Sequence, residues 1–174
     1  NIYLELDKLD EAEANFTRAI TLNPSYAEAH SNLGVTLQRL KRLEDAEASY
    51  QRVIALNPEN AEAYYNLGIA YKAQGKLDES IASYNKALSL QPDYAEVYNN
   101  IGNAHTEQGK LEKALEAFKK ALSIKPDLAD AHYNIGLTLK SQGKVSEAIE
   151  AFKKALSIKP DFDKALNDMG IALQ

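Results

Sequence analysis

The sequence lacks several features that would indicate particular functions. It contains no cysteine, which excludes disulfides, thiol catalysis and zinc sites built from cysteine thiolates. No apolar run approaches the roughly 20 residues that a membrane-spanning helix needs, and no secretory signal peptide is visible. No stretch has the G-x-x-x-x-G-K pattern of a phosphate-binding loop. These absences remove most of the recognisable enzyme, nucleotide-binding and membrane classes.

Charge and composition narrow the possibilities further. The formal net charge is −5 and the pI is about 5.3, which disfavours a nucleic-acid or anionic-membrane partner. Hydrophobic residues make up 45% of the chain and charged residues 26%, as in folded soluble proteins rather than disordered ones. We therefore expect a folded protein with neither nucleic acid nor membrane as partner, and the cytoplasm as its compartment.

The sequence repeats one motif at a fixed interval of 34 residues. Asn66-Leu67-Gly68 has copies that begin at Asn32, Asn100 and Asn134, and an altered copy that begins at Asp168. All five prolines share one repeat position, and all eight glycines share two. A fixed period of this size is typical of stacked repeats, in which each unit packs mainly on its neighbours.

The period divides the chain into four complete units and two partial ones. The complete units are residues 27–60, 61–94, 95–128 and 129–162. Residues 1–26 are interpreted as the end of a first helix plus a second helix, and residues 163–174 as the first helix of a further unit. Because the chain opens in mid-repeat without a methionine, we expect one continuous solenoid that is a fragment of a longer protein.

Apolar spacing predicts two helices in each unit. In the second unit, apolar residues recur at i, i+3, i+4 and i+7 spacing, which predicts a first helix over residues 62–74 and a second over 77–90. Small residues stand where helices approach closely, and large residues stand opposite them. The small ones are Gly68 and its equivalents with Ala46, Ala87, Ala114, Ala121, Ala148 and Ala155; the large ones are Tyr50, Tyr84, Phe118 and Phe152.

Helix starts and stops are also marked. Gly75 is expected to end a first helix in the left-handed conformation. Lys41 holds the same position in the first unit, at an expected cost of about 1 kcal/mol. Ser25 and Asp93, each followed three residues later by an acid, match the capping box that begins a helix.

Taken together, these residues resemble the tetratricopeptide repeat (TPR) family, whose pattern is W-x₂-L-G-x₂-Y…A-x₃-F…P. In the second unit the matching residues are Tyr64 in place of Trp, Leu67, Gly68, Tyr71, Ser80 in place of Ala, Tyr84 and Pro92. The resemblance covers the whole chain. It implies an all-α fold, a right-handed superhelix (α-solenoid) of antiparallel helix pairs whose first helices line a concave groove. It also implies a non-catalytic array that binds proteins or peptides.

One residue of the motif is not explained by packing. Asn66 is a mediocre helix former, but its amide offers both a donor and an acceptor to an extended peptide. The row Asn32, Asn66, Asn100 and Asn134 is similar to the asparagine ladder of O-linked N-acetylglucosamine transferases. The alternative is that this asparagine belongs to the repeat consensus and bonds a neighbouring helix or water. The sequence leaves both open.

The resemblance implies further groove residues. Tyr65 and Tyr133 are expected anchors, because aromatic residues dominate binding hot spots. The same surface is expected to include Asn99, Asn103, Lys72 and Lys140, with Glu28, Glu62, Glu96 and Asp130 along its edge. Chaperone-adaptor TPR domains bind a terminal carboxylate with a Lys-Asn-Asn-Lys-Arg set. The best register here is Asn99, Asn103, Asn134, Lys164 and Asp168, which lacks two of the cations and disfavours that ligand.

Other candidate sites are interpreted as structural. His30, His105 and His132 occupy packing positions, so neither a metal nor a cofactor is expected. The acid pairs Glu44/Asp45 and Asp78/Glu79 are adjacent on helices and point in different directions, which is unsuitable for catalysis.

A basic stripe is expected on the outer surface. It consists of Lys119, Lys120, Lys153 and Lys154 with Lys125 and Lys159. A solvated surface is the favoured interpretation of this stripe, and an acidic partner is the alternative.

The sequence therefore predicts a non-enzymatic scaffold that binds an extended peptide or protein segment in its groove. Two alternatives stay open. The array could assemble end to end through uncapped terminal helices, or it could be the substrate-recognition arm of a larger enzyme such as a glycosyltransferase.

Overall fold

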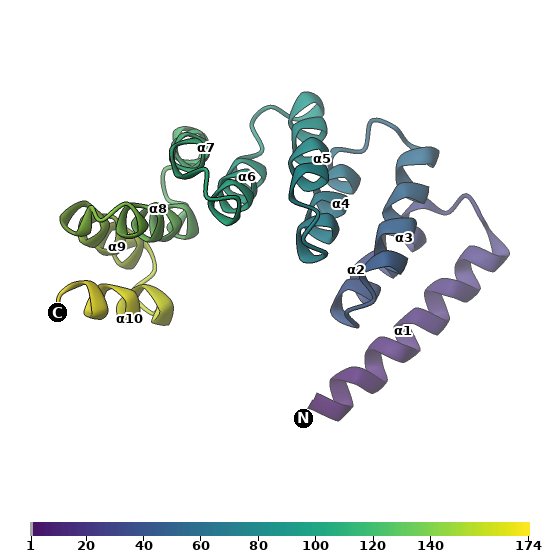
Figure 1. The fold of residues 1–174 in the computed structure, drawn as a ribbon. Coiled ribbons are helices and arrows are strands. Elements are labelled where there is room, and N and C mark those ends of the chain that lie inside the picture. Colours follow the sequence, from purple (N-terminus) through teal and green to yellow (C-terminus); the bar gives the residue numbers. More distant parts are fainter. Residues whose placement is uncertain (1) are drawn as a thin grey trace. The chain divides into compact units, whose positions relative to one another are not determined.

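The computed structural model describes the backbone of residues 2–174 and the side chains of residues 8–174. Ten α-helices and no strands occur in the described backbone (Figure 1). They are α1 (Ile2–Leu22), α2 (Ala27–Arg39), α3 (Leu43–Leu56), α4 (Ala61–Ala73), α5 (Leu77–Leu90), α6 (Ala95–Glu107), α7 (Leu111–Ile124), α8 (Ala129–Ser141), α9 (Val145–Ile158) and α10 (Asp163–Ala172).

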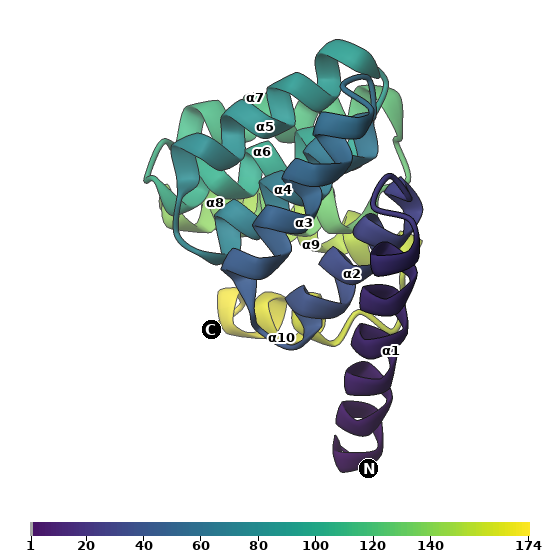
Figure 2. The ribbon, with the colours of Figure 1, turned by 90° about the vertical axis from the view of Figure 1, so that its right-hand side faces the viewer.

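The helices form two compact units, Asn1–Pro92 and Asp93–Gln174. Within the first, α2 packs on α3 and α4 on α5, and α3 joins the two pairs by packing on α4. Within the second, α6 packs on α7 and α8 on α9, while α7 contacts α8 and α9 contacts α10. Consecutive helices run antiparallel, as can be followed within each unit in Figures 1 and 2. The predicted all-α class of antiparallel helix pairs is confirmed.

The first 26 residues differ from the expectation. The sequence predicts the end of one helix, a turn and a second helix there, but α1 is a single helix of 21 residues. The equivalent turns later in the chain have glycine at Gly75, Gly109 and Gly143, whereas this segment has Asp7. The missing glycine makes a turn less favourable there, but it does not by itself account for the continuous helix, because Lys41 makes the equivalent turn without glycine.

Helix boundaries otherwise follow the sequence closely. The helix expected over residues 62–74 is α4, one residue earlier at each end, and α5 begins and ends where predicted. The first helices end at residues with positive φ, which is 77° at Gly75 and 72° at Gly109. Lys41 has a φ of 63° at the same turn. The prediction that Lys41 occupies a position suited to glycine is confirmed.

The predicted capping boxes are wrong. The N-cap of α2 is Tyr26 rather than Ser25, and that of α6 is Tyr94 rather than Asp93; neither cap residue accepts a side-chain hydrogen bond. Ser25 instead donates its hydroxyl to Asn23 Oδ1 at 2.8 Å. The turn after each proline brings the helix start one residue later than the capping pattern requires, so the polar side chain lies outside the cap position.

The two helices of a pair meet where a glycine lies on an aromatic ring. A Cβ built on Gly102 would overlap Cε1 of Phe118, and the Phe118 side chain is 1% exposed. Gly68 faces the ring of Tyr84 in the same way. Because real Cβ atoms do not approach a ring so closely, only glycine allows this contact between the helices.

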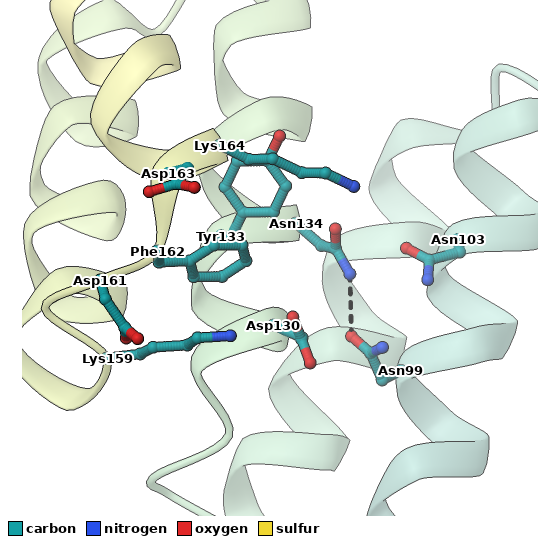
Figure 3. A pocket seen from close by; sticks show the side chains of 10 residues that line it. All are labelled: Asn99, Asn103, Asp130, Tyr133, Asn134, Lys159, Asp161, Phe162, Asp163 and Lys164. Carbon is teal, nitrogen blue, oxygen red and sulfur yellow. Dashed lines mark hydrogen bonds between the residues drawn. The ribbon is translucent and has the colours of Figure 1, made fainter. Parts of the chain in front are cut away.

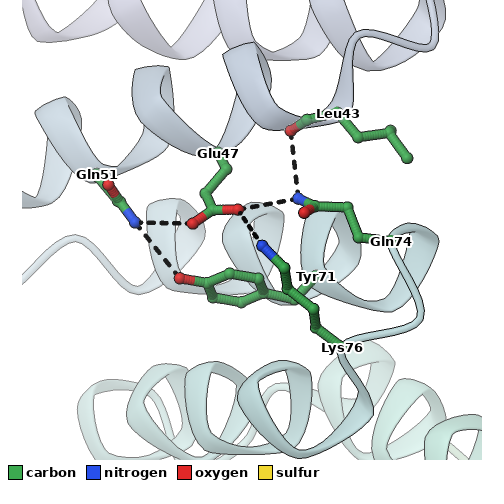
Figure 4. Close-up of polar contacts among 6 residues, drawn as sticks. All are labelled: Leu43, Glu47, Gln51, Tyr71, Gln74 and Lys76. Carbon is green, nitrogen blue, oxygen red and sulfur yellow. Dashed lines mark hydrogen bonds and ion pairs between the residues drawn. The ribbon is translucent and has the colours of Figure 1, made fainter.

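Polar contacts stabilise the junction between α3 and the turn after α4 (Figure 4). The Glu47 carboxylate accepts hydrogen bonds from Gln74 Nε2 at 3.0 Å, Lys76 Nζ at 3.0 Å and Gln51 Nε2 at 3.1 Å. Burial raises the pKa of Glu47, but the bonds from Gln74 and Lys76 outweigh burial and the net pKa is lowered. This contribution to stability is present above the unfolded-state pKa and is lost as pH falls through the folded-state value.

Alanine at two glycines of the same repeat position is expected to change stability in opposite directions. Gly102→Ala places a methyl group against the Phe118 ring and is expected to destabilise by about 1–3 kcal/mol. A Cβ on Gly170 meets nothing within 4 Å, so Gly170→Ala is expected to stabilise by up to about 1 kcal/mol through helix propensity. Urea unfolding measures both. Equal effects of the two substitutions would refute the close-contact explanation.

The left-handed residue at the first turn gives a second prediction. Lys41→Gly removes the Cβ clash of this conformation, so unfolding free energy should rise by about 1 kcal/mol. Gly75→Ala, at the equivalent turn with a φ of 77°, is the matched reverse substitution and should lower it by a similar amount. An unchanged urea midpoint for Lys41→Gly would show that this turn is not strained.

Candidate functional site: a polar pocket in the groove of the second unit

A pocket of about 520 Å³ lies among the first helices α6, α8 and α10 of the second unit (Figure 3). Three amides and three carboxylates line it: Asn99, Asn103 and Asn134 with Asp130, Asp161 and Asp163. Two lysines and two aromatic rings complete the lining: Lys159, Lys164, Tyr133 and Phe162. The volume lies within the usual range for ligand pockets, although the lining is more polar than most.

Two of these amides are joined across neighbouring helices. Asn134 Nδ2 on α8 donates to Asn99 Oδ1 on α6 at 3.0 Å, and Asn99 is only 9% exposed. Among residues 8–174, the Asn99 Nδ2 group has no hydrogen-bond partner. The bond therefore leaves a donor on Asn99 and an acceptor on Asn134, both belonging to residues that line the pocket (Figure 3).

The next repeat uses the same spacing for a different bond. Tyr133 Oη donates to Asp168 Oδ2 at 2.7 Å, and Lys140 Nζ lies 3.9 Å from Asp168 Oδ1. Like Asn99 and Asn134, Tyr133 and Asp168 are 35 residues apart. Burial, together with the bond to Asp168, raises the pKa of Tyr133 to about 12. Residues 35 apart therefore pair across adjacent first helices in this unit, and the pairing determines which polar groups are left for a ligand.

The tyrosine ring is held by two phenylalanines. Its centroid lies 4.9 Å from that of Phe162 and 5.8 Å from that of Phe152. Tyr133 thus forms an apolar wall of the pocket whose position is fixed by ring packing.

Asp130, a carboxylate of the pocket, lacks the ion pair that Glu96 forms at the same position of the preceding repeat. Lys125 Nζ donates to Glu96 Oε1 at 3.0 Å. Lys159 and Asp130 occupy the same two positions in the next repeat, but no ion pair joins them among the described side chains. Lys159 Nζ instead lies 5.1 Å from the centroid of the Phe162 ring. The expectation that Lys159 belongs to an outer basic stripe is wrong, because Lys159 lines this pocket. Lys125, expected in the same stripe, forms an ion pair with Glu96 on α6.

Family models match almost the entire chain. A model described as TPR repeat matches residues 1–41, 39–75, 70–109 and 102–143, and a model described as Tetratricopeptide repeat matches residues 129–162. The chain belongs to the TPR family.

Solved structures with this TPR fold are similar over most of their length. A protein named MamA is 31% identical, with 90% of this chain and 91% of that chain covered and a TM-score of 0.79. YrrB, described as a TPR protein with an unusual peptide-binding site, is 25% identical over 97% and 87%, with a TM-score of 0.74. TTC0263 of Thermus thermophilus is 25% identical over 98% and 93%, with a TM-score of 0.80. No curated protein matches the sequence.

The TPR groove residues predicted from the sequence do not all converge. Four of the ten line the pocket: Asn99, Asn103, Tyr133 and Asn134. Lys140 is not a lining residue, but it lies 3.9 Å from Asp168, which accepts a hydrogen bond from the lining residue Tyr133. Asn100 is half-buried on α6 but is not among the lining residues.

The remaining predicted residues lie on the first unit. Asn32 is exposed on α2, while Asn66 and Lys72 are half-buried on α4. The ring of Tyr65 packs 6.1 Å from that of Tyr84. A separate groove pocket of about 350 Å³ in this unit is lined by Val35, Gln38, Arg39, Lys41, Leu43, Ile69 and Ala73, so it differs in chemistry from the pocket of the second unit.

Sequence reasoning missed the contribution of the turn between repeats. Asp161 and Phe162 follow Pro160 and reach the pocket from outside the first helices. One sequence feature that indicates a difference at this pocket is Asp130, which stands where the three preceding repeats have glutamate. The shorter side chain is visible in the sequence, but its effect on the ion pair depends on side-chain reach.

Two histidines contact the loop that precedes their own helix. His30 Nε2 lies 3.1 Å from Pro24 O and His132 Nε2 lies 3.0 Å from Pro126 O. In the part of the chain whose side chains are described, no three histidines or carboxylates are placed to hold a metal ion. None of the described helices is both long and apolar enough to cross a membrane.

Proposed function

We propose that this TPR protein is a non-catalytic scaffold that binds an extended peptide or protein segment in the groove of its second unit. The observation that carries the proposal is the Asn134–Asn99 bond, which leaves one donor and one acceptor in a pocket of about 520 Å³. TPR domains typically mediate protein–protein interactions, and the structurally similar YrrB has a peptide-binding site.

The amide pair suits a peptide backbone. A peptide unit in an extended segment presents a carbonyl acceptor and an N–H donor, which complement Asn99 Nδ2 and Asn134 Oδ1. Such contacts tolerate many peptide sequences, because they involve no side chain of the ligand. The Tyr133 ring supplies an adjacent apolar contact that favours some sequences over others.

This proposal refines the asparagine row predicted from the sequence. Asn32, Asn66, Asn100 and Asn134 share one repeat position, but the residue 35 positions before Asn66 is Ser31 rather than an asparagine. Asn134 is bonded to a second amide, that of Asn99, and both residues line the pocket of the second unit. The similarity to the transferase ladder is accordingly proposed for Asn134 and its partner Asn99 alone.

An end-to-end assembly is a second candidate. On α10 and just after it, Leu166, Ile171 and Leu173 are 47%, 50% and 64% exposed, and an apolar face of this kind suits packing against another helix. A recognition arm within a larger enzyme is compatible with the same groove, since the arm would bind its substrate through the peptide contacts proposed above.

Removing one amide is expected to weaken peptide binding. The probe is a peptide selected on the wild-type protein from a displayed library of random ten-residue sequences, with affinity measured by fluorescence anisotropy. Asn134→Ala removes a peptide acceptor and disrupts the placement of Asn99, so Kd should rise about tenfold, the sum of two hydrogen bonds of roughly 0.5–1.5 kcal/mol each. Helicity, followed by circular dichroism, should stay unchanged.

Asn32→Ala is the matched control. Asn32 has the same repeat position but is exposed on α2 of the other unit, so the same peptide should bind this variant as it binds the wild type. Wild-type affinity in both Asn134→Ala and Asn99→Ala would refute the amide pair as a peptide contact. Failure to select any peptide would refute the proposed function.

A further inference from the structure

An ion pair present in the repeat before the pocket has no equivalent in the pocket itself. Glu96 is bonded to Lys125, and this bond lowers the pKa of the Glu96 carboxyl. Asp130 and Lys159 occupy the same two repeat positions, with a carboxylate side chain shorter by one methylene. No ion pair within 4.0 Å joins them among the described side chains, and Lys159 Nζ lies 5.1 Å from the centroid of the Phe162 ring. Asp130 is therefore a pocket carboxylate with no bound cation among the described residues.

The charge around Asp130 is negative on balance. The pocket lining carries the three carboxylates Asp130, Asp161 and Asp163 against the two lysines Lys159 and Lys164. Lys140 lies 3.9 Å from Asp168, so its charge is directed to that carboxylate. Of the two pocket lysines, Lys159 lies over a ring and Lys164 is exposed.

A second feature of the same pocket points to a peptide ligand. Asn99 is 9% exposed, its Oδ1 accepts from Asn134, and its Nδ2 has no partner among residues 8–174. This Nδ2 group is not among the fully buried side-chain atoms that lack a partner, so it is open to the pocket and free to donate to a ligand. A carbonyl group of a ligand would accept a hydrogen bond from Asn99 Nδ2. A positively charged group of the same ligand would then lie near the Asp130 carboxylate.

We propose that the pocket binds a lysine or arginine side chain of the peptide, and that Asp130 is the carboxylate that receives this cation. The inference rests on the proposed function, since the peptide backbone contacts Asn99 and Asn134. The ligand class is therefore an extended basic segment. Asp161 and Asp163, which also line the pocket, add to the attraction for the cation.

The first measurement is the composition of selected peptides. Sequences selected on the wild-type protein from the random ten-residue library should be enriched in lysine and arginine relative to the unselected library. Replacing the critical lysine of one selected peptide by glutamine should raise its Kd about three- to fivefold, as for an exposed ion pair, and glutamate should raise it further. Raising the salt concentration to about 0.5 M should reduce the difference through screening.

The sharper measurement uses a substitution that conserves charge. Asp130→Glu restores the side-chain length of Glu96 and is expected to pair with Lys159 as Glu96 pairs with Lys125. The preference for lysine over glutamine should then be lost, as it should be in Asp130→Asn. Glu62→Asp is the matched control, because Glu62 has the same repeat position in the other unit, and its preference should equal that of the wild type.

Each outcome has a distinct meaning. If peptides bind and Asn134→Ala weakens them, but lysine and glutamine peptides bind equally, the proposed function stands and the inference is overturned. If the lysine preference survives in Asp130→Asn, Asp130 is not the receiving carboxylate. If it is lost in Asp130→Asn but survives in Asp130→Glu, the role of Asp130 is supported and the explanation by side-chain length is overturned. If no peptide binds, the proposed function and the inference fail together.

Discussion

The contact between a glycine and an aromatic ring determines how each helix pair is built. At Gly102 the ring of Phe118 occupies the space that a Cβ would need, so the two helices lie as close as their backbones allow. In an α-helix each residue is rotated by about 100° from the last. Asn100, two residues before Gly102, therefore points away from the partner helix. The packing requirement of the glycine thus directs the asparagine of the motif away from the partner helix, and in the next repeat Asn134 contacts Asn99 on the neighbouring first helix.

The same geometry places one repeat's polar residues against the next. The pairs Asn99–Asn134 and Tyr133–Asp168 both join residues 35 apart. Each bond uses some of the donor and acceptor groups of the two side chains and leaves the other groups available to a ligand. In the pair of two amides, the Asn99 Nδ2 donor and the Asn134 Oδ1 acceptor stay available. In the pair of tyrosine and aspartate, the tyrosine hydroxyl donates to the aspartate carboxylate. Ligand-binding capacity therefore varies along an array whose backbone is nearly periodic.

Much of the fold could be predicted from the period alone. The helix ends at Gly75 and the strained Lys41 follow from backbone conformation, and the buried Phe118 follows from apolar spacing. The helix caps could not be predicted, because a shift of one residue moves Ser25 out of the capping position. The long helix α1 was missed because the period implied a turn between residues 2 and 22, where the structure has one continuous helix.

The site was less predictable than the fold for a physical reason. Asn99, Asn103, Asn134 and Tyr133 were expected in the groove, and all four line the pocket. The alternative left open by the sequence, that the motif asparagine bonds a neighbouring helix, describes the bond from Asn134 to Asn99. Its partner could not be named from the sequence, since the bond depends on the distance between two helices of different repeats. The repeat pattern also does not reveal that Glu96 and Lys125 form an ion pair while no such pair joins Asp130 and Lys159 among the described side chains.

Side-chain amide resonances provide the most direct measurement of peptide binding at this pocket. The ¹⁵N-labelled protein is titrated with a library-selected peptide, and the Asn99 and Asn134 side-chain NH₂ signals are assigned by substitution. The account predicts that these two signals shift with saturation, while backbone signals of the outer helices α7 and α9 do not. Shifts confined to α7 and α9, with the Asn99 and Asn134 amides unchanged, would contradict it.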